Sequence, residues 1–397
     1  MTQMAVDEID VDAVRADTPA CRDLIHFNNC GTSLPPQPVL DSMIDYLRLE
    51  AAIGGYEAAE AEADGLARVY AAGARLLGCD RHELAFTTSS SEAWWRAFLS
   101  VPLAPGDRVL VGRTEYLANM LALIQVAERG VDVEVVPDDG TGQIDLESLA
   151  TLLDERVKLV CLTSIAMTNG LVNPTAEVGA LVNAAGAYFL VDACQAVGQI
   201  PVDVEAWGCD FLAFTGRKFV RGPRGTGMLY VRRSIMDQLE APIFIDGRSA
   251  EWTSDTTYRL HPTAQRFEFF ECSYGAKLGF GRALDYALDL GLDAIETRIV
   301  GLADRLRAGL DGLSTARSLD TGSRKCGIVT FEVDGHEAAE VARRLRSVAI
   351  NAGSLGVASS RLDLGSRSVF EVVRLGVHYF NTEDEVDRLV AEIASMR

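Results

Sequence analysis

Short apolar runs alternate with longer amphipathic segments over the first two thirds of the chain. The runs have the length of buried strands, and the segments between them repeat apolar residues at helical spacing. Strands are predicted at 133–136, 159–163, 189–191 and 211–214, and helices at 145–154 and 175–185. The alternation predicts an α/β fold with a doubly wound, mainly parallel sheet that binds ligands at the carboxyl ends of its strands.

The pattern changes near residue 290, after a helix at 274–290 and before another at 292–310. From there the order is a strand at 327–333, a helix at 337–347, a strand at 369–375 and a helix at 382–395. This α+β pattern predicts a smaller C-terminal domain over 290–397, following a large domain over 25–289. Residues 1–24 are mostly polar and are expected to pack onto the fold as a tail.

The composition is that of an acidic globular protein. The 397 residues suffice for more than one domain, and 48% hydrophobic with 24% charged residues is typical of a soluble chain. The net charge of −20 argues against nucleic-acid or anionic-membrane partners. The eight cysteines form no CxxC motif or Cys/His cluster, which predicts a cytoplasmic protein without a metal site. We expect neither a signal peptide nor a membrane span.

One lysine stands just beyond a predicted buried strand. The run 211–214 is followed by Thr215, Gly216, Arg217 and Lys218, and a glycine-rich loop then leads to a second apolar run. A lysine at this place is positioned to lose water, which lowers its pKa and favours Schiff-base chemistry. Thr215 and Arg217 are donors of the kind that bind phosphate. For this motif alone, a solvated loop lysine is the better interpretation.

A carboxylate follows the preceding strand in the same way. Asp192 ends the run 189–191, and Gln195 stands three residues further on. Alone, Asp192 is equally well explained as the N-cap of a helix.

Together, VDACQAVGQ and TGRKFVRGPRGTG resemble the pyridoxal phosphate (PLP) enzymes of the class V aminotransferase, or cysteine desulfurase-like, family. The resemblance extends over about residues 24–390. It implies PLP fold type I, with a mainly parallel seven-stranded sheet in the large domain. It also implies that Asp192 pairs with the pyridine nitrogen, Gln195 contacts the phenolic oxygen and Lys218 binds PLP covalently. GGYEAAE at 54–60 resembles the C–S lyases of ergothioneine and related sulfur-metabolite biosynthesis.

The same resemblance assigns further cofactor contacts. Ser90 and Ser91 begin a predicted helix, where free N–H groups suit a phosphate; taken alone, an ordinary Ser N-cap followed by Glu92 is the better interpretation, but the resemblance implies that this turn holds the PLP phosphate. Thr215 and Arg217 are assigned to the cofactor too. Tyr116 takes the place of the aromatic residue that lies over the ring in this family, and it is a poorer base near neutral pH than the usual histidine.

Substrate contacts are implied at both ends of the chain. Asn29 lies in NNCGT, which resembles the substrate-side loop of the family, and Arg374 precedes HYFNT, where the family binds the substrate carboxylate. A surface ion pair is the alternative for Arg374. Met167 stands where many relatives have a polar residue near PLP, and Asn169 is a weak candidate to replace it. The irregular segment 243–272 is expected to cross the interface of a homodimer with shared active sites.

The motifs leave the reaction open. A cysteine desulfurase needs a nucleophilic cysteine within 350–374, and that segment has none, while Cys326 precedes an apolar strand and is expected to be structural. We therefore predict a C–S lyase that acts by β-elimination on an S-substituted cysteine or its sulfoxide. Decarboxylation with oxidative deamination, transamination and epimerisation remain alternatives. A non-enzymatic descendant is disfavoured, because it would not need Asp192, Gln195 and Lys218 together.

Overall fold

The computed structural model describes residues 8–396, and its core is one seven-stranded sheet with the strand order β2-β8-β7-β6-β5-β3-β4. β3 to β7 are parallel, and β8 runs antiparallel to both β2 and β7. The strands are β2 (Leu84–Thr87), β3 (Arg108–Val111), β4 (Asp132–Val135), β5 (Val157–Thr163), β6 (Tyr188–Asp192), β7 (Phe211–Thr215) and β8 (Gly227–Val231). The predicted α/β fold with a mainly parallel sheet is confirmed.

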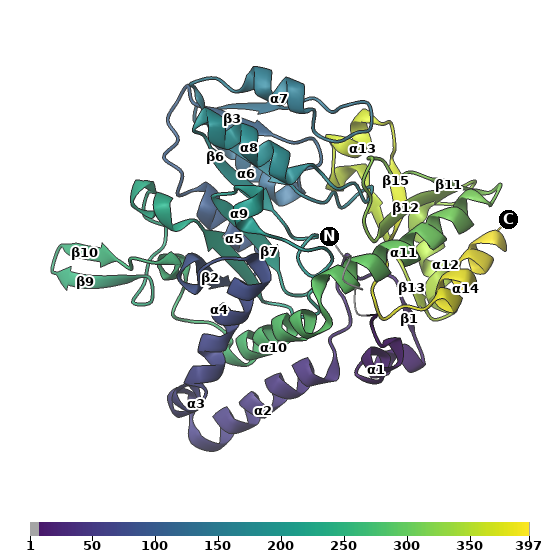
Figure 1. The fold of residues 1–397 in the computed structure, drawn as a ribbon, viewed down its shortest axis with the longest axis horizontal. Helices are drawn as coiled ribbons and strands as arrows, with labels where there is room; N and C mark the ends of the chain where they lie inside the picture. Colours follow the sequence, from purple (N-terminus) through teal and green to yellow (C-terminus); the bar gives the residue numbers. More distant parts are fainter. Residues whose placement is uncertain (1–7, 397) are drawn as a thin grey trace, which may run out of the picture.

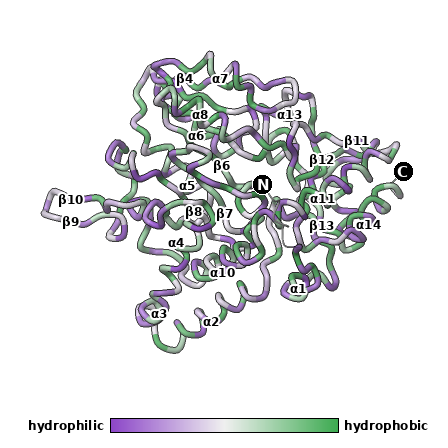
Figure 2. Tube along the Cα trace, viewed as in Figure 1, coloured by the Kyte–Doolittle hydropathy of each residue, from purple (hydrophilic) through white to green (hydrophobic). Residues whose placement is uncertain are grey.

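Helices cover both faces of this sheet (Figure 1). Alternate strand residues point to opposite faces, so that Val109 and Phe211 pack with α5 and α6, while Leu110 and Leu212 pack on the opposite side. Green, hydrophobic stretches accordingly mark the central strands in Figure 2. The helices of this part are α2 (Gln37–Ile53), α3 (Gly55–Ala61), α4 (Ala63–Leu77), α5 (Ser90–Phe98), α6 (Leu117–Ala127), α7 (Leu146–Leu152), α8 (Thr175–Ala185), α9 (Val204–Trp207) and α10 (Tyr274–Leu290).

The C-terminal part has its own four-stranded sheet, with the order β11-β12-β15-β14. It forms a separate hydrophobic cluster beneath its helices. Its elements are α11 (Leu292–Asp311), β11 (Ala316–Ser318), β12 (Ile328–Val333), α12 (Ala338–Ser347), β13 (Ile350–Asn351), β14 (Gly353–Gly356), α13 (Asp363–Ser366), β15 (Glu371–Gly376) and α14 (Glu383–Ala394). This part lies to the right of the large sheet in Figure 1.

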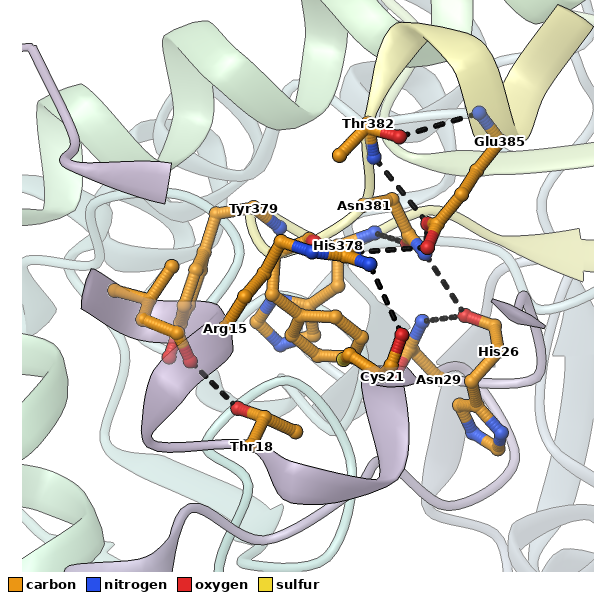
Figure 3. A network of polar contacts seen from close by, with 12 residues as sticks. Arg15, Thr18, Cys21, His26, Asn29, His378, Tyr379, Asn381, Thr382 and Glu385 are labelled. Atoms are coloured by element: carbon orange, nitrogen blue, oxygen red, sulfur yellow. Dashed lines mark hydrogen bonds and ion pairs between the residues drawn. The ribbon is translucent and has the colours of Figure 1, made fainter. Parts of the chain in front are cut away.

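The N-terminal segment joins the two parts. β1 (Ile25–His26) pairs in parallel with β13, and α1 (Val11–Ala16) lies below the C-terminal part in Figure 1. Figure 3 shows the contacts near α1. Arg15 Nη1 lies 2.8 Å from Glu385 Oε1, and Thr18 accepts a hydrogen bond from Arg221, which follows Lys218 by three residues. Residues 1–7 of the predicted tail lie outside the described residues.

The segment 243–272 contains more regular structure than the sequence predicts. β9 (Ala250–Ser254) and β10 (Thr257–Leu260) form an antiparallel hairpin that projects to the left in Figure 1. Its residues are almost all exposed, so the apolar periodicity that identifies a strand beside a core is missing. Across residues 8–396, no helix is long and apolar enough to span a membrane, and no cluster of potential metal ligands is found.

Candidate active site

A cavity of about 470 Å³ opens at the carboxyl end of the large sheet, against residues from the C-terminal part. Its size is within the usual range of small-molecule sites. Nine of the ten predicted site residues line it: Ser90, Ser91, Tyr116, Asp192, Gln195, Thr215, Arg217, Lys218 and Arg374. The motifs lie far apart in sequence, and the parallel sheet brings them together because neighbouring strands end at the same edge.

Asp192 and Lys218 face this cavity from neighbouring strands. Asp192 is the last residue of β6, which pairs with β7, and Lys218 comes three residues after the end of β7. Both side chains are buried. Burial raises the pKa of Asp192, whereas bonds from Asn119 and from the Cys194 N–H, together with the charge of Lys218, favour its carboxylate. The Lys218 Nζ lies 3.3 Å from the Cys194 Sγ.

The start of α5 forms one wall of the cavity. Ser89 is the N-cap, because its hydroxyl accepts a hydrogen bond from the Glu92 N–H at 3.1 Å. Ser90 and Ser91 are then the first two residues of the helix, where N–H groups have no partner within the helix. A Cβ on Gly227 would lie 2.7 Å from the Ser89 carbonyl carbon, so β8 approaches this helix end closely. The geometry suits a phosphate at the positive end of α5.

Buried polar atoms without a partner indicate where ligand groups would bind. Among the described residues these include Gln195 Oε1, Arg374 Nε and Asn119 Oδ1, all on side chains that line the cavity. Such atoms are costly unless they are hydrogen-bonded. A ligand with a phosphate, a ring nitrogen and a carboxylate in reach of this cavity matches the donors and acceptors present, and the residues therefore fit PLP and an amino acid.

Asn29 is the predicted site residue that does not line the cavity. It is fully buried, its amide group donates to the carbonyls of His26 and Gly376, and its Oδ1 accepts from Ser33. These bonds fix the loop, whose next residues, Cys30 and Gly31, do reach the cavity. A role for Asn29 in substrate binding through its own side chain stays a prediction.

Met167 and Asn169, which lie two residues apart, differ in their relation to the cavity. Met167 lines the cavity, and its backbone oxygen accepts a long hydrogen bond from Arg374 at 3.4 Å. Asn169 is not among the lining residues. Its Oδ1 binds the Leu171 N–H, and its amide donates to Asp363. Both polar ends of Asn169 are thus bonded within the chain, and its side chain does not reach the cavity beside Met167.

The segment 350–374 forms part of the cavity wall and contains no cysteine. Leu355 and Ser359 line the cavity, and Asp363 bonds to Thr168 and Asn169 of the large domain. Cys326 is fully buried, and burial raises the pKa of its thiol to about 12. This environment favours the structural role expected for Cys326.

Two polar residues next to Asp192 were not predicted from the sequence. Glu115 is buried behind Asp192, and Asn119 bridges the two carboxylates, donating to Glu115 at 3.1 Å and to Asp192 at 2.9 Å. Glu115 also accepts from the Thr163 N–H at 2.6 Å. Burial, and next the charge of Asp192, raise the pKa of Glu115 to about 7. Asn119 follows Tyr116 by one helical turn, which is the only sequence signal for this bridge.

Comparisons with known proteins agree on the family and the fold. The sequence model described as Aminotransferase class-V matches residues 25–389. A probable cysteine desulfurase of Halobacterium salinarum is 32% identical over 422 residues, which cover 98% of this chain and 97% of that protein. The apo structure of a cysteine desulfurase from Thermococcus onnurineus has a TM-score of 0.90 at 28% identity, covering 100% and 99% of the two chains. A cystine C–S lyase in complex with its product, cysteine persulfide, has a TM-score of 0.86 at 22% identity, covering 95% and 99%, which is a likeness of fold.

The raised pKa of Glu115 predicts a pH-dependent stability. Between about pH 4.5 and about pH 7 the folded chain keeps a proton on Glu115 that the unfolded chain releases. The free energy of unfolding therefore falls as the pH rises through this window. Glu115→Gln is expected to make that fall shallower, measured by urea unfolding of the apoprotein at several pH values. Glu128→Gln, at the exposed C-cap of α6, is the matched control. If the free energy of unfolding changed equally with pH in the wild type and in Glu115→Gln, the raised pKa of Glu115 would be contradicted.

Proposed function

Because this chain belongs to the class V aminotransferase family of PLP-dependent enzymes, we propose that it breaks the C–S bond of a cysteine-derived amino acid. The favoured reaction is β-elimination from an S-substituted cysteine or its sulfoxide, in the biosynthesis of a sulfur-containing secondary metabolite. One observation carries this choice. The wall formed by residues 350–374 offers the cavity Leu355 and Ser359 and contains no thiol that could accept sulfur.

The side chains divide the work as follows. Bound PLP supplies an electron sink conjugated to the substrate Cα. Asp192 would keep the ring nitrogen protonated, and its Oδ2 accepts a hydrogen bond from Asn119 at 2.9 Å. Arg374 would bind the substrate carboxylate with its planar fork, and Lys218 would anchor the cofactor and move the Cα proton. Tyr116, the N-cap residue of α6, also lines the cavity.

The reaction balances without an oxidant. The Lys218 amine takes the proton from Cα, and the Cβ–S bond breaks with its electron pair leaving on sulfur. The remaining three-carbon unit is released as aminoacrylate, which water converts to pyruvate and ammonia. A tyrosine side chain protonates a leaving thiolate less readily than a histidinium does. A sulfoxide or another good leaving group needs less help, so such substrates are favoured over free cysteine.

A cysteine desulfurase is the second candidate, and the names of the relatives favour it. In that reaction an enzyme thiolate would attack the substrate sulfur, and alanine would leave. Among the described residues, Cys30 and Cys194 are the thiols that line the cavity. A desulfurase built on this chain would therefore have to form its persulfide on one of these two, inside the cavity.

Product analysis separates the candidates. The holoenzyme is incubated with cysteine, S-ethylcysteine and S-ethylcysteine sulfoxide, and pyruvate, alanine, sulfide and carbon dioxide are measured. We expect pyruvate, with the highest kcat/KM for the sulfoxide. Alanine and sulfide from free cysteine, with a persulfide on Cys30 or Cys194 by mass spectrometry, would establish the desulfurase instead. Carbon dioxide would indicate decarboxylation with oxidative deamination, a keto acid with sulfur retained would indicate transamination, and racemised substrate would indicate epimerisation.

Arg374 should be required for amino-acid binding. Its side chain is buried and its Nε has no partner within the described residues, so loss of a substrate carboxylate contact should cost about 2–5 kcal/mol. Arg374→Ala should accordingly lower kcat/KM by roughly 30-fold or more. Arg374→Lys should recover little, because the two-pronged contact is lost. Arg317→Ala, on an exposed arginine of the same sheet, is the control. Unchanged kinetics in Arg374→Ala would assign the carboxylate to another residue.

We also propose a homodimer with shared active sites. Ile243 and Phe244 are exposed and border an apolar hollow that shares Ser89 and Ser91 with the cavity. Trp252 and Tyr258 are exposed opposite each other on the hairpin. Exposed aromatic groups of this size favour a partner surface. Arg266 takes no part in this proposal, because its guanidinium binds the carbonyls of His261 and Met236 within its own chain.

Sedimentation tests the dimer. The wild type should sediment as a dimer, and a Trp252→Ser/Tyr258→Ser double variant should dissociate at a higher protein concentration, because apolar area is lost from the interface. Arg259→Ser, next to Tyr258 on β10, serves as the hairpin control. A wild-type protein that sediments as a monomer at micromolar concentration would contradict the proposal.

A further inference from the structure

Three arginines line the same cavity: Arg217, Arg224 and Arg374. Their hydrogen-bond partners within residues 8–396 are the carbonyl of Gly31, the hydroxyl of Thr32 and the carbonyl of Met167, and none is a carboxylate. Asp192 is the one carboxylate among the described lining residues. In a chain with 57 acidic and 37 basic residues, guanidinium groups gathered without counter-charges indicate that the ligands carry negative charge.

PLP and the α-carboxylate of the amino-acid substrate account for two of the three arginines. Arg374 is assigned to the substrate carboxylate, and Arg217 to the cofactor beside Lys218. The phosphate is also provided with the free N–H groups at the start of α5. Arg224 therefore remains without a role in binding either the cofactor or the part of the substrate common to all amino acids.

The loop that carries Arg224 is fixed in place. Pro223 precedes it, Thr226 Oγ1 donates to the Pro223 carbonyl at 2.7 Å, and Gly225 has a φ of +78°, which favours glycine. Arg224 Nη2 donates to Thr32 Oγ1 at 3.1 Å, on the loop that also brings Cys30 and Gly31 to the cavity. This contact uses one of the five guanidinium N–H donors. The others are free for a group that enters from solvent, because Arg224 is exposed at the cavity rim.

We propose that Arg224 is a specificity-determining residue that selects cysteine conjugates whose S-substituent carries an anionic group, a carboxylate in the simplest case. The identity of the ligand as a cysteine conjugate rests on the proposed function. The α-carboxylate binds Arg374 deep in the cavity, and the far end of the S-substituent meets Arg224 at the rim. A neutral substituent leaves the guanidinium in water and gains nothing from it.

The test compares two substrates of similar size, S-carboxymethylcysteine and S-ethylcysteine, in the holoenzyme. A charge-assisted hydrogen bond is worth about 1.5–3 kcal/mol. Wild type should therefore prefer the carboxymethyl substrate, and Arg224→Gln should lower the ratio of the two kcat/KM values by roughly tenfold or more. Arg224→Glu should shift preference towards S-(2-aminoethyl)cysteine. Arg233→Gln, on an exposed arginine outside the cavity, should leave the ratio unchanged.

Affinity for PLP distinguishes a substrate contact from a phosphate contact. Absorbance titration of the apoprotein should show weaker PLP binding in Arg217→Gln and wild-type binding in Arg224→Gln. A selectivity ratio that does not change in Arg224→Gln overturns the proposal, and weakened PLP binding in that variant together with an unchanged ratio assigns Arg224 to the phosphate. The dissociation constants of the two amino acids, measured from the change in cofactor absorbance, need no turnover. If C–S cleavage fails but these constants still depend on Arg224, the proposed function is wrong and the anionic specificity stands.

Discussion

The structure depends on holding charged groups out of water at one edge of a parallel sheet. Asp192 and Lys218 are both buried where β6 and β7 end, and neither would be stable there without partners. The protein supplies some of these partners itself. Asn119 and the Cys194 N–H bind the carboxylate, and Glu115 fixes Asn119 from behind. Three further polar atoms without a partner, on Gln195, Arg374 and Asn119, belong to described residues that line the cavity, where polar groups of a ligand would pair with them.

This constraint also explains why the family does not determine the reaction. The groups that hold PLP and an amino acid are the same for elimination, transamination and sulfur transfer. We therefore look for the choice among these reactions in the cavity walls, where Leu355 and Ser359 line one side and Arg224 lies at the rim. The anchoring of Asp363 to Thr168 makes the first of these walls part of the fixed structure.

Local sequence signals were sufficient for the fold and for much of the site. Strand ends made Asp192 and Lys218 candidates, and the family resemblance, which the comparisons confirm, assigned them to a cofactor site together with Ser90, Tyr116 and Arg374; all five line one cavity. Contacts between distant segments were not visible in the same way. The bridge from Glu115 through Asn119 depends on how α6 packs against β6. Asn29 donates a hydrogen bond to the carbonyl of Gly376, which is remote in sequence. The exposed β9–β10 hairpin has no apolar period to reveal it.

The central claim is that the cofactor is held at the edge of the large sheet by Lys218. The protein offers a clear rival in Lys277, a buried lysine whose pKa is lowered by burial and which lines a second cavity of about 560 Å³. Reduction of the purified holoenzyme with borohydride, followed by peptide mapping, identifies the lysine that carries the cofactor. The account predicts one phosphopyridoxyl group, on the peptide that contains Lys218. A label on Lys277, or on any other lysine in place of Lys218, would contradict it.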